Sequence, residues 1–229
     1  MAIATIANQE AKVKILDPAV FKIRKETILQ HARHLFANKG YAETSMDDIA
    51  HACHVQKASL YHYFTSKQEL LQQMVDWEVG EWWATRLKDY ESARDLRETL
   101  TLIGTLFLQD MNDTRRQEFF KIIHFESHKN PAILKALKES PTHNRKGFYA
   151  VFARHLAGRL PQTQIAMFMT QFMGGLIHYA VLSKLRGENM CYEKFEDAAY
   201  VEQLADIFLK GIHAETPHDG RPPVVWRNH

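Results

Sequence analysis

The stretch VQKASLYHYFTSK, from Val55 to Lys67, decides how the fold of this 229-residue chain is interpreted. It places two lysines, two tyrosines, one histidine and three serine or threonine hydroxyls around Leu60 and Phe64. Because these two apolar residues are four positions apart, they would share one face of a helix. The stretch predicts a short helix, from about Lys57 to Tyr63, with an outer face of groups that can bind phosphates or base edges.

Two further helices are expected before this stretch. From Phe21 onward, apolar residues recur at helical spacing until NKGY, which starts at Asn38, supplies a glycine stop. Thr44 and Ser45 each precede an acidic residue by three positions, as in a capping box, and predict a second helix from about Met46 to Cys53. Only HVQ separates the second helix from the third. The pair therefore predicts a helix-turn-helix, whose second helix can lie in the DNA major groove.

The outer side chains of the third helix fit that role. Lysine and glutamine can pair with guanine and adenine edges, and serine can pair with several acceptors. The residues on or near this rim are Gln56, Lys57, Ser59, Tyr61 and His62, and those suited to phosphate are Tyr63 and Lys67. The alternative is an amphipathic helix whose polar face only meets solvent, and a bare helix-turn-helix pattern leaves that alternative open.

The rest of the chain also predicts helices, and the fold class is all-α. A long helix starts near Thr65 or Ser66, and later helices are expected at Asp95–Met111, Thr114–Ser127, Pro131–Leu137, Thr142–Gly158, Gln162–Arg186 and Phe195–His213. The expected domains are a flexible lead (1–20), a helix-turn-helix DNA-binding domain (21–67), a helical effector-binding and dimerisation domain (68–213) and a tail (214–229).

Composition indicates a globular protein, with 45% hydrophobic and 24% charged residues. The sequence shows two cysteines, no export signal and no apolar run as long as a membrane span, so we expect a reduced, cytoplasmic protein. The net charge of +2 is uninformative by itself. However, positive charge exceeds negative charge in the segment up to Lys67, where DNA binding is expected.

The segment from about Lys25 to Leu71, which includes ILQHARHLFANKGYAETSMDDIAHACHVQKASLYHYFTSKQELL, resembles the N-terminal domain of TetR-family transcriptional regulators. The resemblance implies an all-helical homodimer of about nine helices per chain. In this family, helices one to three bind DNA, a larger domain binds a small molecule and the last two long helices form the dimer interface. The positions that the resemblance assigns to phosphate are Thr44, Ser45, Tyr61, Tyr63 and Lys67. Those that it assigns to bases or to register are Gln56, Lys57, Ser59 and His62.

Three residues depart from the family pattern. His54 stands where the turn usually has glycine, Gln56 where it has a serine cap, and Ala58 where glycine is frequent. Histidine tolerates a left-handed backbone better than most residues, so we expect the turn to form with some strain at His54.

The larger domain is rich in aromatic residues and methionines, most of which should form an ordinary helical core. A subset could line an apolar cavity with a few polar anchors, as in small-molecule sites. The residues predicted for this pocket are Trp82, Phe107, Met111, Phe120, His124, Phe148, Phe152, Phe172 and Met173. His124 and His128 have a spacing that lets two imidazoles share a metal, but chance pairs are expected among 13 histidines, and no metal or cofactor is predicted.

The segment QIAMFMTQFMGGLIHYAVLSKL is apolar around most of a helix, and its glycine pair would lower helix propensity unless close approach compensates. With the 200–212 helix it could form a four-helix interface across a two-fold axis. The residues predicted for the dimer interface are Phe172, Gly174, Gly175, Tyr179, Leu204 and Phe208. The alternative is a central core helix whose glycine pair is accidental.

The sequence therefore predicts a ligand-responsive, sequence-specific DNA-binding regulator of transcription. We expect a repressor that a small, largely apolar effector releases from a palindromic operator. No nucleophile with a base, phosphate loop or cofactor fingerprint is recognisable, so an enzyme is not expected. Two alternatives stay open: a helical metal-binding protein or enzyme that uses the His124 and His128 region, and a DNA-binding regulator without a ligand.

Overall fold

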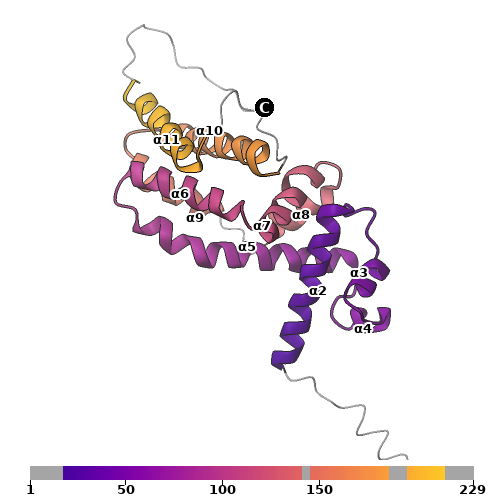
Figure 1. Cartoon of the computed structure of the whole chain (residues 1–229). Helices are drawn as coiled ribbons and strands as arrows, with labels where there is room; N and C mark the ends of the chain where they lie inside the picture. Colours follow the sequence, from indigo (N-terminus) through magenta and orange to yellow (C-terminus); the bar gives the residue numbers. More distant parts are fainter. Residues whose placement is uncertain (1–17, 141–144, 186–194, 215–229) are drawn as a thin grey trace, which may run out of the picture. The chain divides into compact units, whose positions relative to one another are not determined.

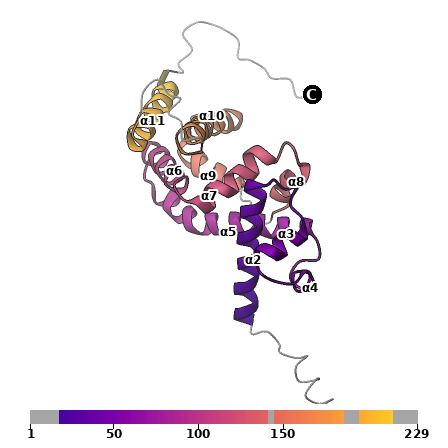
Figure 2. The same ribbon diagram turned by 45° about the vertical axis from the view of Figure 1, so that its right-hand side comes forward.

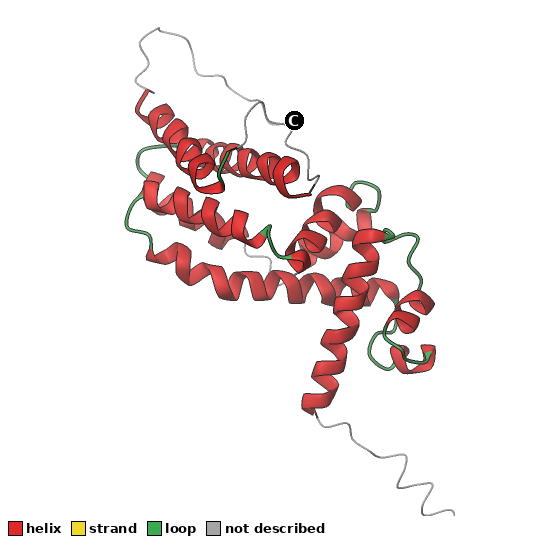
Figure 3. Ribbon diagram, viewed as in Figure 1, coloured by secondary structure: helices red, strands yellow, loops and turns green. Residues whose placement is uncertain are grey.

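A computed structural model describes residues 18–140, 145–185 and 195–214 of the chain. These residues form helices joined by short loops, and no strand is present among them (Figures 1 and 3). The chain divides into two compact units: one comprises the residues up to Trp82 with Glu118–His143, and the other comprises Trp83–Gln117 with the residues from Asn144 onward. The helices α5 (Lys67–Ser92) and α7 (Thr114–Lys121) contribute to both units.

The first unit contains the predicted helix-turn-helix. Its elements are α2 (Pro18–Asn38), α3 (Met46–Ala52), α4 (Lys57–Tyr61), the start of α5, the end of α7, the π-helix η1 (Ile122–Glu126) and α8 (Pro131–Glu139). Two boundaries differ from expectation. Helix α2 begins at Pro18, inside the segment predicted as a flexible lead, and α4 ends at Tyr61, two residues early.

Three helices of the helix-turn-helix share one apolar core with the start of α5. Phe36 of α2, Ile49 of α3 and Leu60 of α4 are fully buried. Phe64, which follows α4, and Leu70 and Leu71 of α5 are fully buried as well. Full burial of such side chains contributes about 1.5–3 kcal/mol each. The core therefore fixes α4 by its inner face and leaves its outer face to solvent.

A buried ion network crosses this unit. The Arg33 guanidinium of α2 donates to Glu78 Oε1 of α5 at 2.8 Å and to Glu118 Oε2 of α7 at 2.9 Å. All three residues are buried. Glu118 Oε1 also lies 2.6 Å from His34 Nδ1. The two carboxylates and the planar guanidinium thus join three helices at defined angles.

The second unit contains the remaining helices. They are the rest of α5, α6 (Leu96–Asp110), the start of α7, α9 (Arg145–Leu156), α10 (Gln162–Ala180), the π-helix η2 (Val181–Leu185) and α11 (Asp197–Ala214). The two segments predicted as single helices at Thr114–Ser127 and Gln162–Arg186 each end in a π-helical turn. The predicted tail, the start at Thr142 and the end at Arg186 lie outside the described residues.

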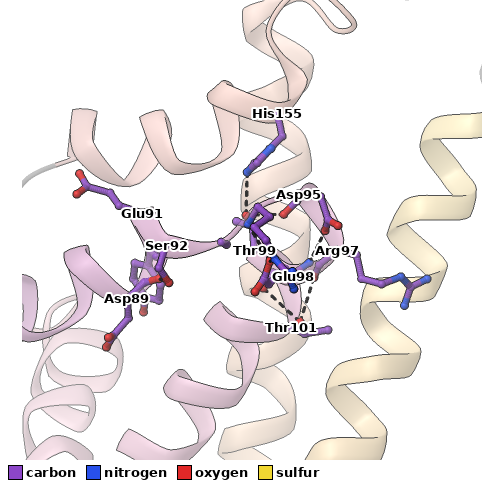
Figure 4. A network of polar contacts seen from close by, with 12 residues as sticks. Asp89, Glu91, Ser92, Asp95, Arg97, Glu98, Thr99, Thr101 and His155 are labelled. Atoms are coloured by element: carbon purple, nitrogen blue, oxygen red, sulfur yellow. Dashed lines mark hydrogen bonds and ion pairs between the residues drawn. The ribbon is translucent and has the colours of Figure 1, made fainter.

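Polar contacts hold the segment that joins α5 to α6 (Figure 4). Asp95 caps α6 by accepting the Glu98 N–H at 2.8 Å. The buried Thr99 hydroxyl lies 3.0 Å from His155 Nε2 of α9. Arg154 donates to the carbonyls of Tyr90, Glu91 and Ala93, at and just beyond the end of α5. These bonds connect α9 to the end of α5.

Helix α6 packs on α9, α10 and α11, and glycine permits two of the close approaches in this unit. A Cβ at Gly104 of α6 would lie 2.7 Å from Val201 of α11, which is too close for any side chain. A Cβ at Gly175 of α10 would lie 3.2 Å from Leu204. The close approach predicted for the glycine pair therefore occurs within one chain and involves Gly175, whereas a Cβ at Gly174 would meet no atom within 4 Å.

One described helical stretch, Gln162–Leu185, is long and apolar enough to cross a membrane by length and composition alone. The sequence analysis expected none. About a third of its most apolar window is buried in the protein, including Phe168, Phe172 and Leu176, which pack in the second unit. A core helix of a soluble protein passes the same test, so the stretch does not by itself indicate a membrane protein.

We expect Arg33→Met to lower the free energy of unfolding by about 3–5 kcal/mol, because it removes the guanidinium that two buried carboxylates share. The measurement is urea unfolding followed by circular dichroism. Arg94→Met is the control, because Arg94 also pairs with a glutamate but is exposed, and it should leave the unfolding curve unchanged. Equal effects of the two substitutions would contradict the structural importance of the network.

Candidate DNA-binding site

The turn between α3 and α4 has the hydrogen bonds of a Schellman motif. The His54 N–H donates to the His51 carbonyl and the Val55 N–H donates to the Ala50 carbonyl, both at 3.0 Å. His54 is the left-handed residue of this motif, with φ of 54°. Such positions favour glycine, so the strain expected at His54 is present.

The start of α3 is fixed by a capping box, as its sequence predicts. The Asp48 N–H donates to Ser45 Oγ, and the Ser45 N–H donates to Asp48 Oδ2 at 2.7 Å. Asp48 also accepts a hydrogen bond from Lys39 at 2.8 Å. The bond from Lys39, together with those from Ser45, lowers the pKa of Asp48. The ionised carboxylate therefore persists at neutral pH and orients the helix that supports α4.

The outer face of α4 gathers most of the side chains predicted to read bases. Gln56, Lys57, Tyr61 and His62 are exposed, and Ser59 is partly exposed. Lys57 Nζ donates to Asp47 Oδ2 of α3 at 2.8 Å, and this bond raises the pKa of Lys57. An ammonium has three donors, so the pair fixes the direction of the Lys57 side chain and leaves two donors for another acceptor.

Two of the residues predicted to contact phosphate are engaged inside the domain. Lys67 Nζ donates to the carbonyls of Tyr41, Ala42 and Thr44 at 2.8–3.2 Å, and burial lowers its pKa. Thr44 is buried and donates to the Gly40 carbonyl at 2.8 Å. Lys67 and Thr44 therefore brace the loop between α2 and α3, and their contact with phosphate stays a prediction.

Tyr63 makes a contact that the sequence analysis missed. Its ring stacks on Phe21 of α2, with ring centroids 4.7 Å apart and planes inclined by 25°. A signal for this contact exists in the sequence, because Phe21 lies four and seven positions before Lys25 and Ile28, on the inner face of α2. The stack joins the first turns of α2 to the segment that follows α4.

The residues predicted for a ligand pocket belong to both units. Trp82, Phe120 and His124 belong to the first unit, where the His124 ring stacks on Phe120 at 4.1 Å. In the second unit, edge-to-face contacts link Phe148 to Phe152 and Phe152 to Phe172, with centroids 5.4 and 6.3 Å apart. The other members of the set in this unit are Phe107 and Met111, which are buried, and Met173, which is partly buried.

The residues predicted for the dimer interface all belong to the second unit. Phe172 and Tyr179 are buried within the chain: Phe172 packs on Phe152 and Phe208, and Tyr179 stacks on Tyr200 at 3.9 Å. Gly175 packs against Leu204 in the same chain. Gly174 is exposed.

An open groove of about 360 Å³ lies between α10 and α11. Met167 and Ile207 on its walls are 49% and 65% exposed, which is high for such apolar side chains. We call this surface the α10–α11 groove; its lining residues are Leu160, Gln164, Met167, Phe168, Gln171, Ile207, Phe208, Gly211 and Ile212. Of the predicted interface residues, only Phe208 lines it.

Among the described residues, no group of three or more histidine, cysteine, aspartate or glutamate side chains is placed to hold a metal ion. His124 lies in the π-helix η1, and His128 follows it in a turn. The regular α-helical spacing on which the metal alternative rests is therefore interrupted. Cys53 is partly buried, and burial raises the pKa of its thiol to about 11.

The sequence profile described as bacterial regulatory proteins, tetR family, matches residues 28–74. In a segment of 51 residues the chain is 45% identical to the biofilm operon icaADBC HTH-type negative transcriptional regulator IcaR of Staphylococcus aureus (strain Newman). The corresponding regulator of Staphylococcus epidermidis is 38% identical over 52 residues. These segments cover 22% and 23% of this chain, and only 27% and 28% of those regulators.

Solved structures extend the likeness to most of the chain. AibR in complex with isovaleryl coenzyme A and operator DNA has a TM-score of 0.60 at 18% identity, covering 80% of this chain and 97% of AibR. FadR from Bacillus subtilis in complex with stearoyl-CoA has a TM-score of 0.62 at 16% identity, covering 81% and 98%. A putative TetR-family regulator from Mesorhizobium loti has a TM-score of 0.58 at 21% identity, covering 85% and 96%. At these identities the likeness shows a shared fold.

We expect His54→Gly to raise the free energy of unfolding by up to about 1 kcal/mol, because glycine adopts the left-handed backbone without the cost borne by an L side chain. His51→Gly is the matched control: it lies within α3 and should destabilise the protein by about 0.5–1 kcal/mol. Thermal unfolding of both variants measures the difference. Destabilisation by His54→Gly equal to that by His51→Gly would contradict the assigned strain.

Proposed function

We propose that this chain is a TetR-family regulator, a sequence-specific transcriptional repressor that binds operator DNA as a homodimer and is released by a small, largely apolar effector; the family profile matches its residues 28–74. The observation that most supports this proposal is the helix-turn-helix. Leu60 anchors the buried face of α4 in the core, while Gln56, Lys57 and His62 are exposed. The family consists of regulators, so no catalytic role is assigned.

In this proposal the exposed face of α4 enters the major groove. Lys57, directed by Asp47, donates to a guanine edge, and Gln56, Ser59 and His62 lie beside neighbouring base pairs. Ser45, Tyr61 and Tyr63 bind the phosphate backbone and set the register. Of these residues, Lys57 is expected to contribute most to base discrimination, because lysine contacts to guanine are a common source of specificity.

The α10–α11 groove supports the homodimer. Two copies related by a two-fold axis would bury Met167 and Ile207, whose exposure is otherwise unfavourable. The pair of α4 helices would then meet successive major grooves about 34–36 Å apart on a palindromic operator. We expect this assembly in the cytoplasm, where the DNA is.

The effector is proposed to be largely apolar because the second unit is built around aromatic rings at contact distance, including Phe148, Phe152 and Phe172. AibR and FadR, which share this fold, bind acyl-coenzyme A molecules. Acyl-coenzyme A esters, whose acyl chains are apolar, are therefore the first effectors to test, with the free acids beside them. Coupling of about 1–3 kcal/mol would change DNA affinity by about 5- to 150-fold.

We expect the wild-type protein to bind duplex from its own promoter region with an affinity that falls as salt rises. Lys57→Met should reduce discrimination between the preferred site and one with a changed guanine by about 1–3 kcal/mol, with much less effect on random duplex. Fluorescence anisotropy measures both, and an effective acyl-coenzyme A ester should lower the affinity of the wild-type protein. The control is Lys138→Met, an exposed lysine of α8. Absence of salt-dependent binding by the wild-type protein would refute the proposed function.

We expect the wild-type protein to sediment as a dimer and Ile207→Glu to sediment as a monomer with unchanged helix content, because the substitution places a charge in the proposed interface. The measurement is analytical ultracentrifugation. Leu134→Glu provides the control, because Leu134 is an exposed apolar residue, 40% exposed, on α8 outside the groove. Dimers of Ile207→Glu as stable as those of Leu134→Glu would exclude this interface.

A further inference from the structure

Helix α2 is longer at its start than a helix-turn-helix core requires. It begins at Pro18, ten residues before the first residue matched by the family profile. These first turns bury little: Val20, Phe21 and Ile23 are all exposed, Ile23 to 62%. Burial of apolar surface therefore does not by itself explain why the chain keeps this segment helical.

Two contacts connect these turns to the segment that follows α4. Phe21 stacks on Tyr63, and Lys25 Nζ lies 5.7 Å from the centroid of the Phe64 ring. Phe21 and Lys25 are one turn apart on the inner face of α2, which continues through the buried Ile28 and Ala32. The extension is therefore a rigid continuation of the domain core beside α4, and both views show this part of α2 alongside α4 (Figures 1 and 2).

The same turns are strongly basic. Residues 18–27 contain Lys22, Arg24 and Lys25 against one acid, Glu26. Lys22 and Arg24 are exposed and lie on opposite sides of the inner stripe that contains Phe21 and Lys25. The Lys22 and Glu26 side chains lie 4.0 Å apart at an exposed position, which is a weak interaction that a phosphate can replace.

We propose that the first two turns of α2 bind backbone phosphates flanking the base pairs read by α4, with Lys22 and Arg24 supplying the charge and Phe21 positioning Tyr63. The inference rests on the proposed function, since the duplex is the same one. A helix fixed by stacking presents its cations at a constant register, whereas a free basic arm would have to be ordered on binding. The partner is duplex DNA longer than the base pairs that α4 itself contacts.

The charge is tested by comparing Lys22→Gln/Arg24→Gln with Lys135→Gln/Lys138→Gln. Each pair removes two exposed positive charges and one i,i+4 ion pair, Lys22 with Glu26 or Lys135 with Glu139. The plot of log binding constant against log salt concentration should lose about 0.9 in slope for each phosphate contact removed, and about 1.8 for both. A slope change no larger than that of the α8 control overturns the proposal.

The positioning role of Phe21 is tested by a double-mutant cycle with Phe21→Ala, Tyr63→Phe and their combination. Each single substitution should weaken binding to all duplexes about twofold or more, and the combination should bind like Tyr63→Phe, because Phe21 acts through the Tyr63 hydroxyl. Ile23→Ala, on another face of the same turns, should bind like the wild-type protein. Melting curves identify any variant that fails to fold, and Phe21→Leu then replaces it. Independent, multiplying effects overturn the positioning role.

The two proposals fail in distinguishable ways. If the wild-type protein shows no salt-dependent binding to duplex, both the proposed function and this inference are rejected. If the wild-type protein binds but both substituted pairs have the same salt slope, the regulator stands and the α2 contact is rejected. Shortening the duplex flanks provides the complementary measurement: the wild-type protein should lose affinity, whereas Lys22→Gln/Arg24→Gln should not.

Discussion

The buried guanidinium of Arg33 is the constraint on which the N-terminal unit depends. It bonds to Glu78 and Glu118 and so restricts how α2, α5 and α7 meet within this unit. An apolar contact would tolerate sliding, because dispersion and hydrophobic burial have no direction. A guanidinium between two carboxylates does not, since its donors lie in a fixed plane. Helix α3 packs on α2 and α4 packs on α3, so their orientation is tied to this charged contact.

Within the helix-turn-helix, polar residues divide into those that hold the domain together and those that face outward. Lys67 donates to three carbonyls and Thr44 to a fourth, which stiffens the loop before α3. Ser45 and Asp48 satisfy each other at the start of α3. With these groups engaged, the outward set around Gln56, Lys57 and His62 rests on a rigid base. Rigid support lowers the ordering cost that a DNA-binding surface pays on association.

The parts of this structure that depend on local chemistry could be predicted from the sequence. The capping box, the glycine stop at Gly40 and the left-handed His54 each involve residues within a few positions of one another. The roles of Lys67 and Phe172 could not be predicted in this way. Lys67 bonds to carbonyls more than twenty residues away, and a lysine beside a recognition helix has the same sequence pattern whether it faces DNA or a loop. An apolar stripe likewise does not reveal whether α11 or a second copy covers Phe172.

The residues of the candidate DNA-binding site show the same difference between local features, which could be predicted, and contacts between helices, which could not. Exposure of Gln56, Lys57 and His62 agrees with the helical period of α4, because that helix has a single buried anchor in Leu60. Two contacts of the site were not predicted: the hydrogen bond from Lys57 to Asp47 and the stacking of Tyr63 on Phe21. Both connect different helices, and single-sequence reasoning contains no measure of the distance between them.

The glycines of the second unit have a consequence for how this sequence can drift over evolutionary time. Gly104 has no room for even a methyl group beside Val201, and Gly175 faces Leu204, so each is tied to its neighbour on α11. A Cβ added at Gly174, the residue before Gly175, would have no atom within 4 Å. Descendants of this chain should therefore keep Gly104, exchange Gly175 where Leu204 shifts or is replaced by a smaller residue, and accept substitutions more readily at 174. Two adjacent glycines, Gly174 and Gly175, should therefore differ in how readily they are substituted.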